Sequence, residues 1–372
     1  MSSKYTIKQI FADHWQEFML TYPNIRPVVK DEVSKMLQCG ELHKGFALYY
    51  CEHCFKFKYV PFRCKSRFCN TCGIAYQMDR SESISKKLLN SKHRHIVFTI
   101  PKELRVFFRK DRSLLNILFL SAAQTIKDWM HCLNKSESFT PGIICGLHTF
   151  GRDLKWNPHI HMLVTEGGMG SNTPWRHIHH FPYLMLRKRW QTTLLVNLEN
   201  ALGKGFFPHL KNKLYSDHKE GFYVHAPHSD FNSAHAVSQY ISRYIGRPAM
   251  AQSRILHYDG RFVTFWYQRH EDDKRIEETL SAFDFIKKLI LHIPQKHFNM
   301  LRYYGLYSMP FSVSSRLIRK RSASQNNARL ILRRWAFRIH SSFGFDPTKC
   351  SCGQYMEFLQ LSYPLPVASV PP

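Results

Sequence analysis

Hydrophobic residues along the chain recur at two spacings, which divide it into expected helices and strands. Apolar residues three or four apart indicate amphipathic helices, and short apolar runs bounded by glycine or proline indicate strands. Helices are predicted over residues 5–38, 74–91, 102–133, 182–202, 233–246 and 275–292. Strands are predicted over residues 93–101, 142–150, 159–167, 221–229 and 262–268. Since only a short polar segment joins the runs at 142–150 and 159–167, these two are expected to form an antiparallel hairpin.

Cysteines are concentrated in the segment that follows the first helical region. Cys51-x-x-Cys54 and Cys69-x-x-Cys72 are separated by fourteen residues. Four thiolates complete the tetrahedral shell of Zn²⁺, and a small module can fold around such an ion without a large core. We therefore predict one structural zinc ion held by these two pairs, with unligated buried thiols as the alternative. Three more residues could replace one of the four or bind a second ion: Cys39, His43 and Cys64.

The charge balance changes the expected partner. The chain has 53 Lys and Arg against 27 Asp and Glu, a formal net charge of +26. Neutralising phosphates releases counterions, so such a surplus favours DNA or another nucleic acid as the partner. Residues 311–340 hold basic side chains and no acidic ones, which suits either a DNA-binding surface or a solvated helix face. The candidate DNA contacts are Arg63, Lys65, Arg67, Arg243, Arg247, Arg333 and Arg334.

The N-terminal segment has no apolar leader, and no stretch approaches the ~18 to 20 apolar residues of a membrane span. A cytoplasmic location without a membrane partner is therefore expected. In that compartment the ten cysteines are expected to be thiols or metal ligands instead of disulfides.

A pair of histidines lies on the second strand of the expected hairpin. His159 and His161 are two apart, so on a strand their imidazoles face the same side and can bind one cation. A hairpin turn centred between Leu154 and Lys155 places His148 opposite His161, which makes His148 the predicted third ligand. Water or a substrate phosphate could fill that position instead, and packing alone is the alternative for the pair.

Two tyrosines lie four apart on the expected helix 233–246. Tyr240 and Tyr244 thus present their hydroxyls on one face, about one turn apart. An aromatic stripe against a sheet is the alternative. Beside a cation that polarises a scissile phosphate, however, either hydroxyl could attack that phosphate.

The order of these motifs resembles the two-tyrosine HUH transposases of the bacterial insertion-sequence ninety-one family. The resemblance rests on the cysteine pairs, P-H-I-H-M-L-V at 158–164 and Q-Y-I-S-R-Y-I-G-R-P at 239–248, and extends over residues 10–308. It implies Mg²⁺ or Mn²⁺ on His159 and His161, nucleophilic Tyr240 and Tyr244, and rolling-circle transposition of single-stranded element ends. Some relatives keep only the second tyrosine, so Tyr244 is the one expected to be indispensable.

The chain departs from the family pattern in two places. Phe68 and Asn70 stand where the family has a histidine and a proline, among the last three cysteines of the N-terminal group. Near the C-terminus, Cys350-Ser351-Cys352 is C-x-C where the family often has C-x-x-C. A second zinc site is therefore not expected.

These observations predict an α+β protein in which an N-terminal zinc-binding module precedes an HUH nuclease core, an antiparallel sheet flanked by helices. The expected divisions are a helical and zinc-binding domain at 1–92, the nuclease core at 93–308 and a basic region at 309–372. A plasmid replication initiator or relaxase, and a non-catalytic zinc regulator that binds DNA, are the alternative functions.

Overall fold

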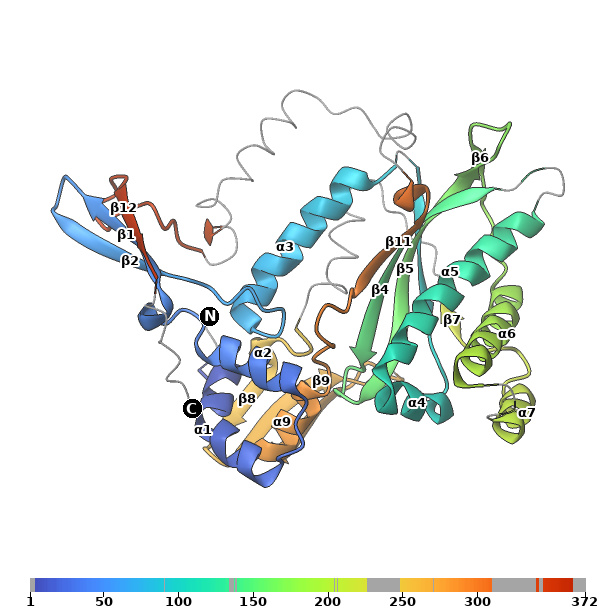
Figure 1. Ribbon diagram of the computed structural model, residues 1–372, viewed down its shortest axis with the longest axis horizontal. Coiled ribbons are helices and arrows are strands. Elements are labelled where there is room, and N and C mark those ends of the chain that lie inside the picture. The colour runs from blue at the N-terminus through green and yellow to red at the C-terminus, as the bar shows by residue number, and fades with distance from the viewer. Residues whose placement is uncertain are drawn as a thin grey trace, which may run out of the picture.

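Three antiparallel sheets with helices between and around them make up the described part of the chain (Figure 1). The computed structural model describes residues 4–89, 91–133, 137, 139–203, 205, 207–225, 248–269, 271–309, 339–340 and 344–363. The expected helix 233–246 and the basic segment 311–338 lie outside these residues. The mixture of helices with purely antiparallel sheets confirms the predicted α+β class.

The largest sheet has six strands among the described residues, in the order β11–β4–β5–β3–β7, with β6 paired to β5. The expected hairpin at its centre is confirmed, because β4 and β5 pair antiparallel. The strands are β3 (His93–Phe98), β4 (Thr140–Phe150), β5 (Trp156–Met169), β6 (Arg176–His177), β7 (Val224–His225) and β11 (Leu301–Gly305).

Helices pack on one face of this sheet, and the histidines of its strands lie on the other face. Alternate strand side chains, such as Ile160 and Met162, join the core formed with the covering helices around Trp129 and Trp190. Because neighbours on a strand face opposite sides, the histidines of the same strands point away from these helices. The covering helices are α4 (Arg105–Lys110), α5 (Leu115–Cys132), α6 (Tyr183–Leu202) and α7 (Pro208–Asp217).

A second sheet packs against the N-terminal helices. Phe11 and Phe18 share a core with Phe265 and Phe285, so residues far apart in the sequence form one layer (Figure 1). This pairing could not be predicted from the sequence pattern. The elements are α1 (Ile7–Thr21), α2 (Pro27–Leu37), β8 (Ile255–Tyr258), β9 (Phe262–Gln268), β10 (Arg275–Ser281) and α9 (Ala282–Ile290).

The expected helix 275–292 is wrong over its first seven residues, which form β10. Along Arg275–Ser281 the exposed and less exposed residues alternate with period two, and the strand pairs with β9 along its whole length. The helix starts only after Ser281, whose hydroxyl accepts a hydrogen bond from the Asp284 N–H at 3.1 Å. An N-cap of this kind marks the true start of a helix.

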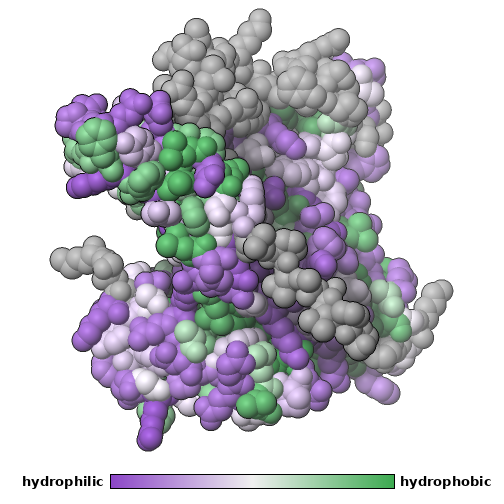
Figure 2. Space-filling view, turned by 60° about the vertical axis from the view of Figure 1, so that its left-hand side comes forward, coloured by the Kyte–Doolittle hydropathy of each residue, from purple (hydrophilic) through white to green (hydrophobic). Residues whose placement is uncertain are grey.

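The third sheet joins the two ends of the chain. β12 (Glu357–Ser362) pairs with β1 (Phe46–Cys51), which in turn pairs with β2 (Lys56–Pro61). Figure 2 turns this side of the molecule forward, and hydrophobic residues lie among hydrophilic ones at its surface. α3 (Asn70–Lys87) runs from this region to the large sheet (Figure 1). The C-terminal region and the N-terminal module therefore share one sheet, which the expected divisions at 92 and 309 did not anticipate.

Short 3₁₀ turns complete the described secondary structure, at Leu42–Lys44, Lys102–Leu104, Arg112–Leu114, Gln252–Arg254 and Leu306–Ser308. Among the described residues, no helix has the length and apolar character needed to cross a bilayer.

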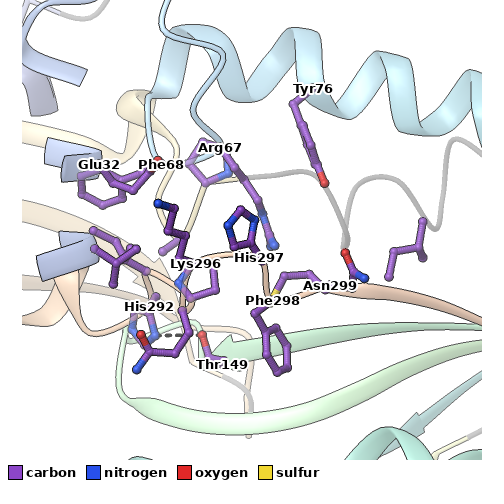
Figure 3. A pocket seen from close by; sticks show the side chains of 18 of the residues that line it. Glu32, Arg67, Phe68, Tyr76, Thr149, His292, Lys296, His297, Phe298 and Asn299 are labelled. Carbon is purple, nitrogen blue, oxygen red and sulfur yellow. Dashed lines mark hydrogen bonds between the residues drawn. The ribbon is translucent and has the colours of Figure 1, made fainter. Parts of the chain in front are cut away.

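One buried histidine connects the second sheet's helix to the β4–β5 hairpin. Nε2 of His292 donates to the Leu154 carbonyl at 2.9 Å, and Nδ1 accepts from the Thr149 hydroxyl at 3.2 Å (Figure 3). Because a carbonyl only accepts, this arrangement fixes the neutral tautomer. Burial lowers the pKa of His292 to about 4, the backbone bond to Leu154 opposes that shift, and Arg112 adds to it.

We expect this histidine to make stability depend on pH. Its pKa is lower in the folded state than the 6.5 of the free side chain, so the unfolded chain binds the proton more tightly. The stability is therefore complete above about pH 6.5 and declines as the pH falls toward 4, by about 3 kcal/mol in all. His292→Gln should lose that dependence, measured as the difference between urea midpoints at pH 7.5 and pH 5. His209→Gln, at an exposed position on α7, is the control; equal pH slopes for both variants would contradict this role.

Candidate metal centres

The structure brings all three predicted histidines together on the face of the large sheet opposite α5 and α6. His148 comes from β4, and His159 and His161 come from β5. One ring nitrogen from each lies within 4.8 Å of the others. Three convergent imidazoles on rigid strands are a donor set for one divalent cation.

The register of the hairpin differs from the prediction by two residues. His148 is opposite His159, whereas Gly146 is opposite His161. The reason is the five-residue connection 151–155, in which Leu154 adopts a left-handed conformation with φ 62°, so that the turn is centred near Asp153. A shift of two keeps each side chain on its own face, which is why the cluster forms despite the error.

Hydrogen bonds orient two of the three rings. Nδ1 of His159 donates to the Asn157 carbonyl at 2.7 Å, which leaves Nε2 with its lone pair. That Nε2 lies 3.0 Å from Nε2 of His161. On the far side of the His161 ring, Nδ1 is 2.9 Å from Nε2 of His95, whose ring is parallel to it within 2°. Such contacts fix the tautomer and direction of metal-binding imidazoles.

His95 was missed in the sequence analysis. It lies on β3, and its neighbour across the strand pair is Leu163 of β5. The signal was present, because His93 and His95 alternate on the predicted strand 93–101 in the way that His159 and His161 do. Buried His93 instead contacts the Tyr307 hydroxyl at 2.5 Å, away from the cluster.

Burial keeps these imidazoles unprotonated. Desolvation lowers the pKa of His159 to about 4, and that of His148 and His161 well below the usual 6.5. The neighbouring histidines add to the effect on His148 and His161. A neutral imidazole is the form that binds a metal ion, so the residues present fit a cation between them.

The cysteines form two clusters instead of the single expected site. In the first, Cys39, Cys64, Cys69 and Cys72 place their sulfurs within 4.8 Å of one another. Cys39 follows α2, whereas Cys69 and Cys72 lie at the start of α3, where the helix dipole favours thiolates. Two of the further candidates, Cys39 and Cys64, thus take the places that were predicted for the other C-x-x-C pair.

The second cluster joins that other pair to the C-terminal C-x-C. Cys51, Cys54, Cys350 and Cys352 also converge within 4.8 Å. Cys51 and Cys352 are 3.6 Å apart, and Cys54 and Cys350 are 3.3 Å apart, measured between sulfurs. The expectation that a C-x-C sequence makes a second site doubtful is therefore wrong as to geometry. Pairing of β12 with β1 brings the two ends together.

The length of one strand explains why the two C-x-x-C pairs do not meet. Cys51 and Cys54 lie at the turn between β1 and β2, and Cys69 follows the far end of β2. A strand of six residues spans about 20 Å, so β2 holds the pairs apart. The spacing of fourteen residues in the sequence therefore does not give the distance between the two pairs in the folded chain. Exposed His43 belongs to neither cluster among the described residues.

The predicted DNA contacts fall into three groups. Lys65 is exposed and Arg63 is half-buried near Gly40, whereas Arg67 extends toward the large sheet. Phe57 and Tyr59, on β2, are exposed aromatic residues of the same region of the sequence. The predicted nucleophiles and the other candidate arginines lie outside the described residues: Tyr240, Tyr244, Arg243, Arg247, Arg333 and Arg334.

Comparisons with known proteins identify the family. Residues 10–100 match the family of the transposase zinc-binding domain, and residues 142–315 match a family described as putative transposase. The transposase for insertion sequence element IS801 from Pseudomonas savastanoi pv. phaseolicola is 31% identical over 326 residues, covering 82% of this chain and 77% of that protein. The chain belongs to the insertion-sequence ninety-one (IS91) family of transposases. This transposase is also similar to putative transposase y4qJ of Sinorhizobium fredii, with 22% identity over 80% of the chain and 79% of the relative. No solved structure matches it.

The two matched regions of the transposase contain the first cysteine cluster and the histidines, but only part of the second cysteine cluster. The zinc-binding region contains the whole first cysteine cluster, and the second matched region contains all three histidines. Cys350 and Cys352 lie beyond both. Structural zinc and a DNA partner accord with these matches.

Proposed function

We propose that this transposase cleaves and rejoins single-stranded DNA through a 5′-phosphotyrosine intermediate and thereby moves an insertion sequence by a rolling-circle route in the bacterial cytoplasm. The observation that carries the proposal is the convergence of three neutral imidazoles, two buried and one partly buried, on one face of an antiparallel sheet. A non-catalytic regulator would have no need of such a buried, costly polar cluster. Resemblance to transposases along most of the chain favours this function over a replication initiator or relaxase.

The proposed catalytic cation is Mg²⁺ or Mn²⁺, held by His148, His159 and His161. When bound, such an ion polarises the scissile phosphate and offsets charge that develops in the transition state. Imidazole ligands suit Mn²⁺ better than the harder Mg²⁺. The protein's own contribution is to hold three rings on two paired strands, two of them oriented by hydrogen bonds.

The nucleophile is proposed to be the hydroxyl of Tyr240 or Tyr244, carried over from the family motif. The phenolic oxygen forms a bond to phosphorus while the bond from phosphorus to the 3′ oxygen breaks. The tyrosine proton leaves to solvent or a nearby base, and the departing 3′ oxygen takes up a proton. Reversal by a 3′-hydroxyl rejoins the strand without hydrolysis, and a second tyrosine allows a second strand to be cleaved before the first is resolved.

The test is formation of a covalent protein–DNA species. Purified transposase is incubated with labelled single-stranded DNA from the element ends and Mn²⁺, then separated by denaturing electrophoresis. We expect a shifted band with the wild type, and its loss or reduction in Tyr244→Phe or Tyr240→Phe. Tyr215→Phe on α7, far from the histidine face, is the matched control. A covalent band of full intensity in a Tyr240→Phe, Tyr244→Phe double variant would refute the assignment.

A further inference from the structure

A pocket of about 630 Å³ lies where α2, the start of α3 and the segment after α9 meet the end of β4 (Figure 3). Its volume is in the range of small-molecule sites, large enough for a nucleotide unit. Residues from the zinc-binding region and from the nuclease sheet line it together. Aromatic side chains on its wall include Phe68, Tyr76, Phe150, Phe298 and Tyr303.

Arg67 extends into this pocket from the segment just before α3 (Figure 3). Its Nη1 is buried and has no hydrogen-bond partner, and it forms no ion pair with any described residue. Burial lowers the pKa of its guanidinium, with a small opposing effect of Tyr76. A buried guanidinium nitrogen that no described residue pairs is costly, so an anion in the pocket would stabilise it.

Two carboxylates line the pocket, those of Asp31 and Glu32, and neither forms an ion pair with Arg67. Glu32 is engaged already, with one oxygen 2.7 Å from the Lys35 amine and the other accepting from the Ser66 hydroxyl at 2.5 Å. Further basic side chains on the wall are Arg80 and Lys296. The guanidinium of Arg80 lies 5.0 Å from the centre of the Tyr76 ring. Cations alternating with aromatic faces are characteristic of single-strand binding channels.

The pocket adjoins the histidine cluster. Phe150 lines it, and the Phe150 ring stacks on His148 with centroids 5.1 Å apart. The His148 ring is in turn 4.5 Å from the ring of His161. The charge of Arg67 is also near enough to lower the pKa of His148. A strand with one phosphate at the histidines could therefore place a neighbouring phosphate at Arg67.

We infer that Arg67 binds a phosphodiester of the DNA strand in this pocket, next to the phosphate at the histidine cluster. The zinc-binding region thus supplies a residue to the nuclease site. Its ligand would be a single-stranded phosphodiester backbone, held by the planar guanidinium through paired hydrogen bonds. Cys64 and Cys69 lie close on either side of Arg67 in sequence, so the first cysteine cluster fixes the segment that presents it. The location beside the reacting phosphate, though not the binding itself, rests on the proposed function.

The experiment measures binding of a 20-nucleotide oligothymidylate to the full-length zinc-loaded protein, without added Mg²⁺ or Mn²⁺, over a range of salt concentrations. We expect Arg67→Gln to raise Kd about tenfold or more. It should also reduce the slope of log K against log salt by about 0.7, the value for one lost phosphate contact on a single strand. Arg67→Lys should keep the slope and recover only part of the affinity. Arg261→Gln, at an exposed turn between β8 and β9, is the matched control with the same charge loss.

Unchanged affinity and salt slope in Arg67→Gln would overturn the phosphate site, even if the wild type cleaves DNA. Conversely, absence of cleavage by the wild type would remove the proposed function and leave the binding result standing. Zinc content checks that the variant folds. If Arg67→Gln loses zinc, the inference is tested on the wild-type protein instead. Bound oligonucleotide should slow the modification of Arg67 by an arginine-specific dicarbonyl reagent, and Arg261 serves as the internal reference. Equal modification with and without DNA would then overturn the inference.

Discussion

Replacing His161 with alanine is expected to lower metal-dependent cleavage of single-stranded DNA by about 10³-fold or more, a loss at least as large as that of an essential transition-state contact. His161 has the central place in the cluster, between Nε2 of His159 at 3.0 Å and Nε2 of His95 at 2.9 Å. Its removal would delete one of the three proposed cation ligands and also release the neighbouring rings. The measurement is the single-turnover rate of strand cleavage at saturating DNA and Mn²⁺.

A packing role for His161 predicts a different pattern. His161→Gln keeps the volume and polarity of the side chain, so a packing residue would tolerate it, whereas a cation ligand would not. Titration with Mn²⁺ adds an independent readout, because both variants should lose one Mn²⁺ site per chain while keeping zinc. His209→Ala, on the exposed side of α7, should leave both the rate and the Mn²⁺ site unchanged. Cleavage at the wild-type rate by His161→Gln would exclude the metal role.

The transposase is expected to contain two zinc ions per chain, in sites that can be lost independently. Cys69→Ser should remove one ion and lower the melting temperature by about 10 °C or more, because its cluster organises the start of α3 and zinc binding contributes directly to folding. Cys352→Ser should remove the other ion with a smaller loss of stability, since Cys352 is exposed at the edge of the molecule. Elemental analysis of purified protein and thermal unfolding measure both effects.

Cys132→Ser provides the control for these variants. Cys132 is an exposed thiol outside both clusters, so its replacement should leave two zinc ions and the melting temperature unchanged. The sharpest contradiction would come from the double variant. If Cys69→Ser and Cys352→Ser together removed only the ion that either removes alone, the two clusters would not bind separate ions.

Local patterns were sufficient for the elements that carry the histidines. Two residues that alternate on a strand share a face whatever the exact register, so His148, His159 and His161 converge although the turn is centred near Asp153. The family motif likewise consists of residues that lie close together in the sequence. The long helical and strand segments around it follow the hydrophobic spacing closely, and β9 coincides with its predicted range 262–268.

Long-range pairing could not be predicted in the same way. The sequence does not show that β2 separates Cys54 from Cys69, or that β12 returns to β1, because both depend on tertiary contacts between distant segments. The sequence predicts a helix over residues 275–281, whereas antiparallel pairing with β9 makes this segment the strand β10. Arg67 was grouped with Arg63 and Lys65 by sequence proximity, although only Arg67 lines the pocket beside the sheet.

The return of β12 to β1 has a consequence for synthesis of the protein. Cys51 and Cys352 are 301 residues apart, so at about 5–20 residues per second the first ligands wait roughly 15–60 s for the last. The β1–β2 hairpin therefore leaves the ribosome with only two of the four cysteines of the second cluster. A message that stops before codon 350 yields a protein whose first cluster can form but whose second cannot. Completion of the second cluster thus reports that translation has passed codon 352.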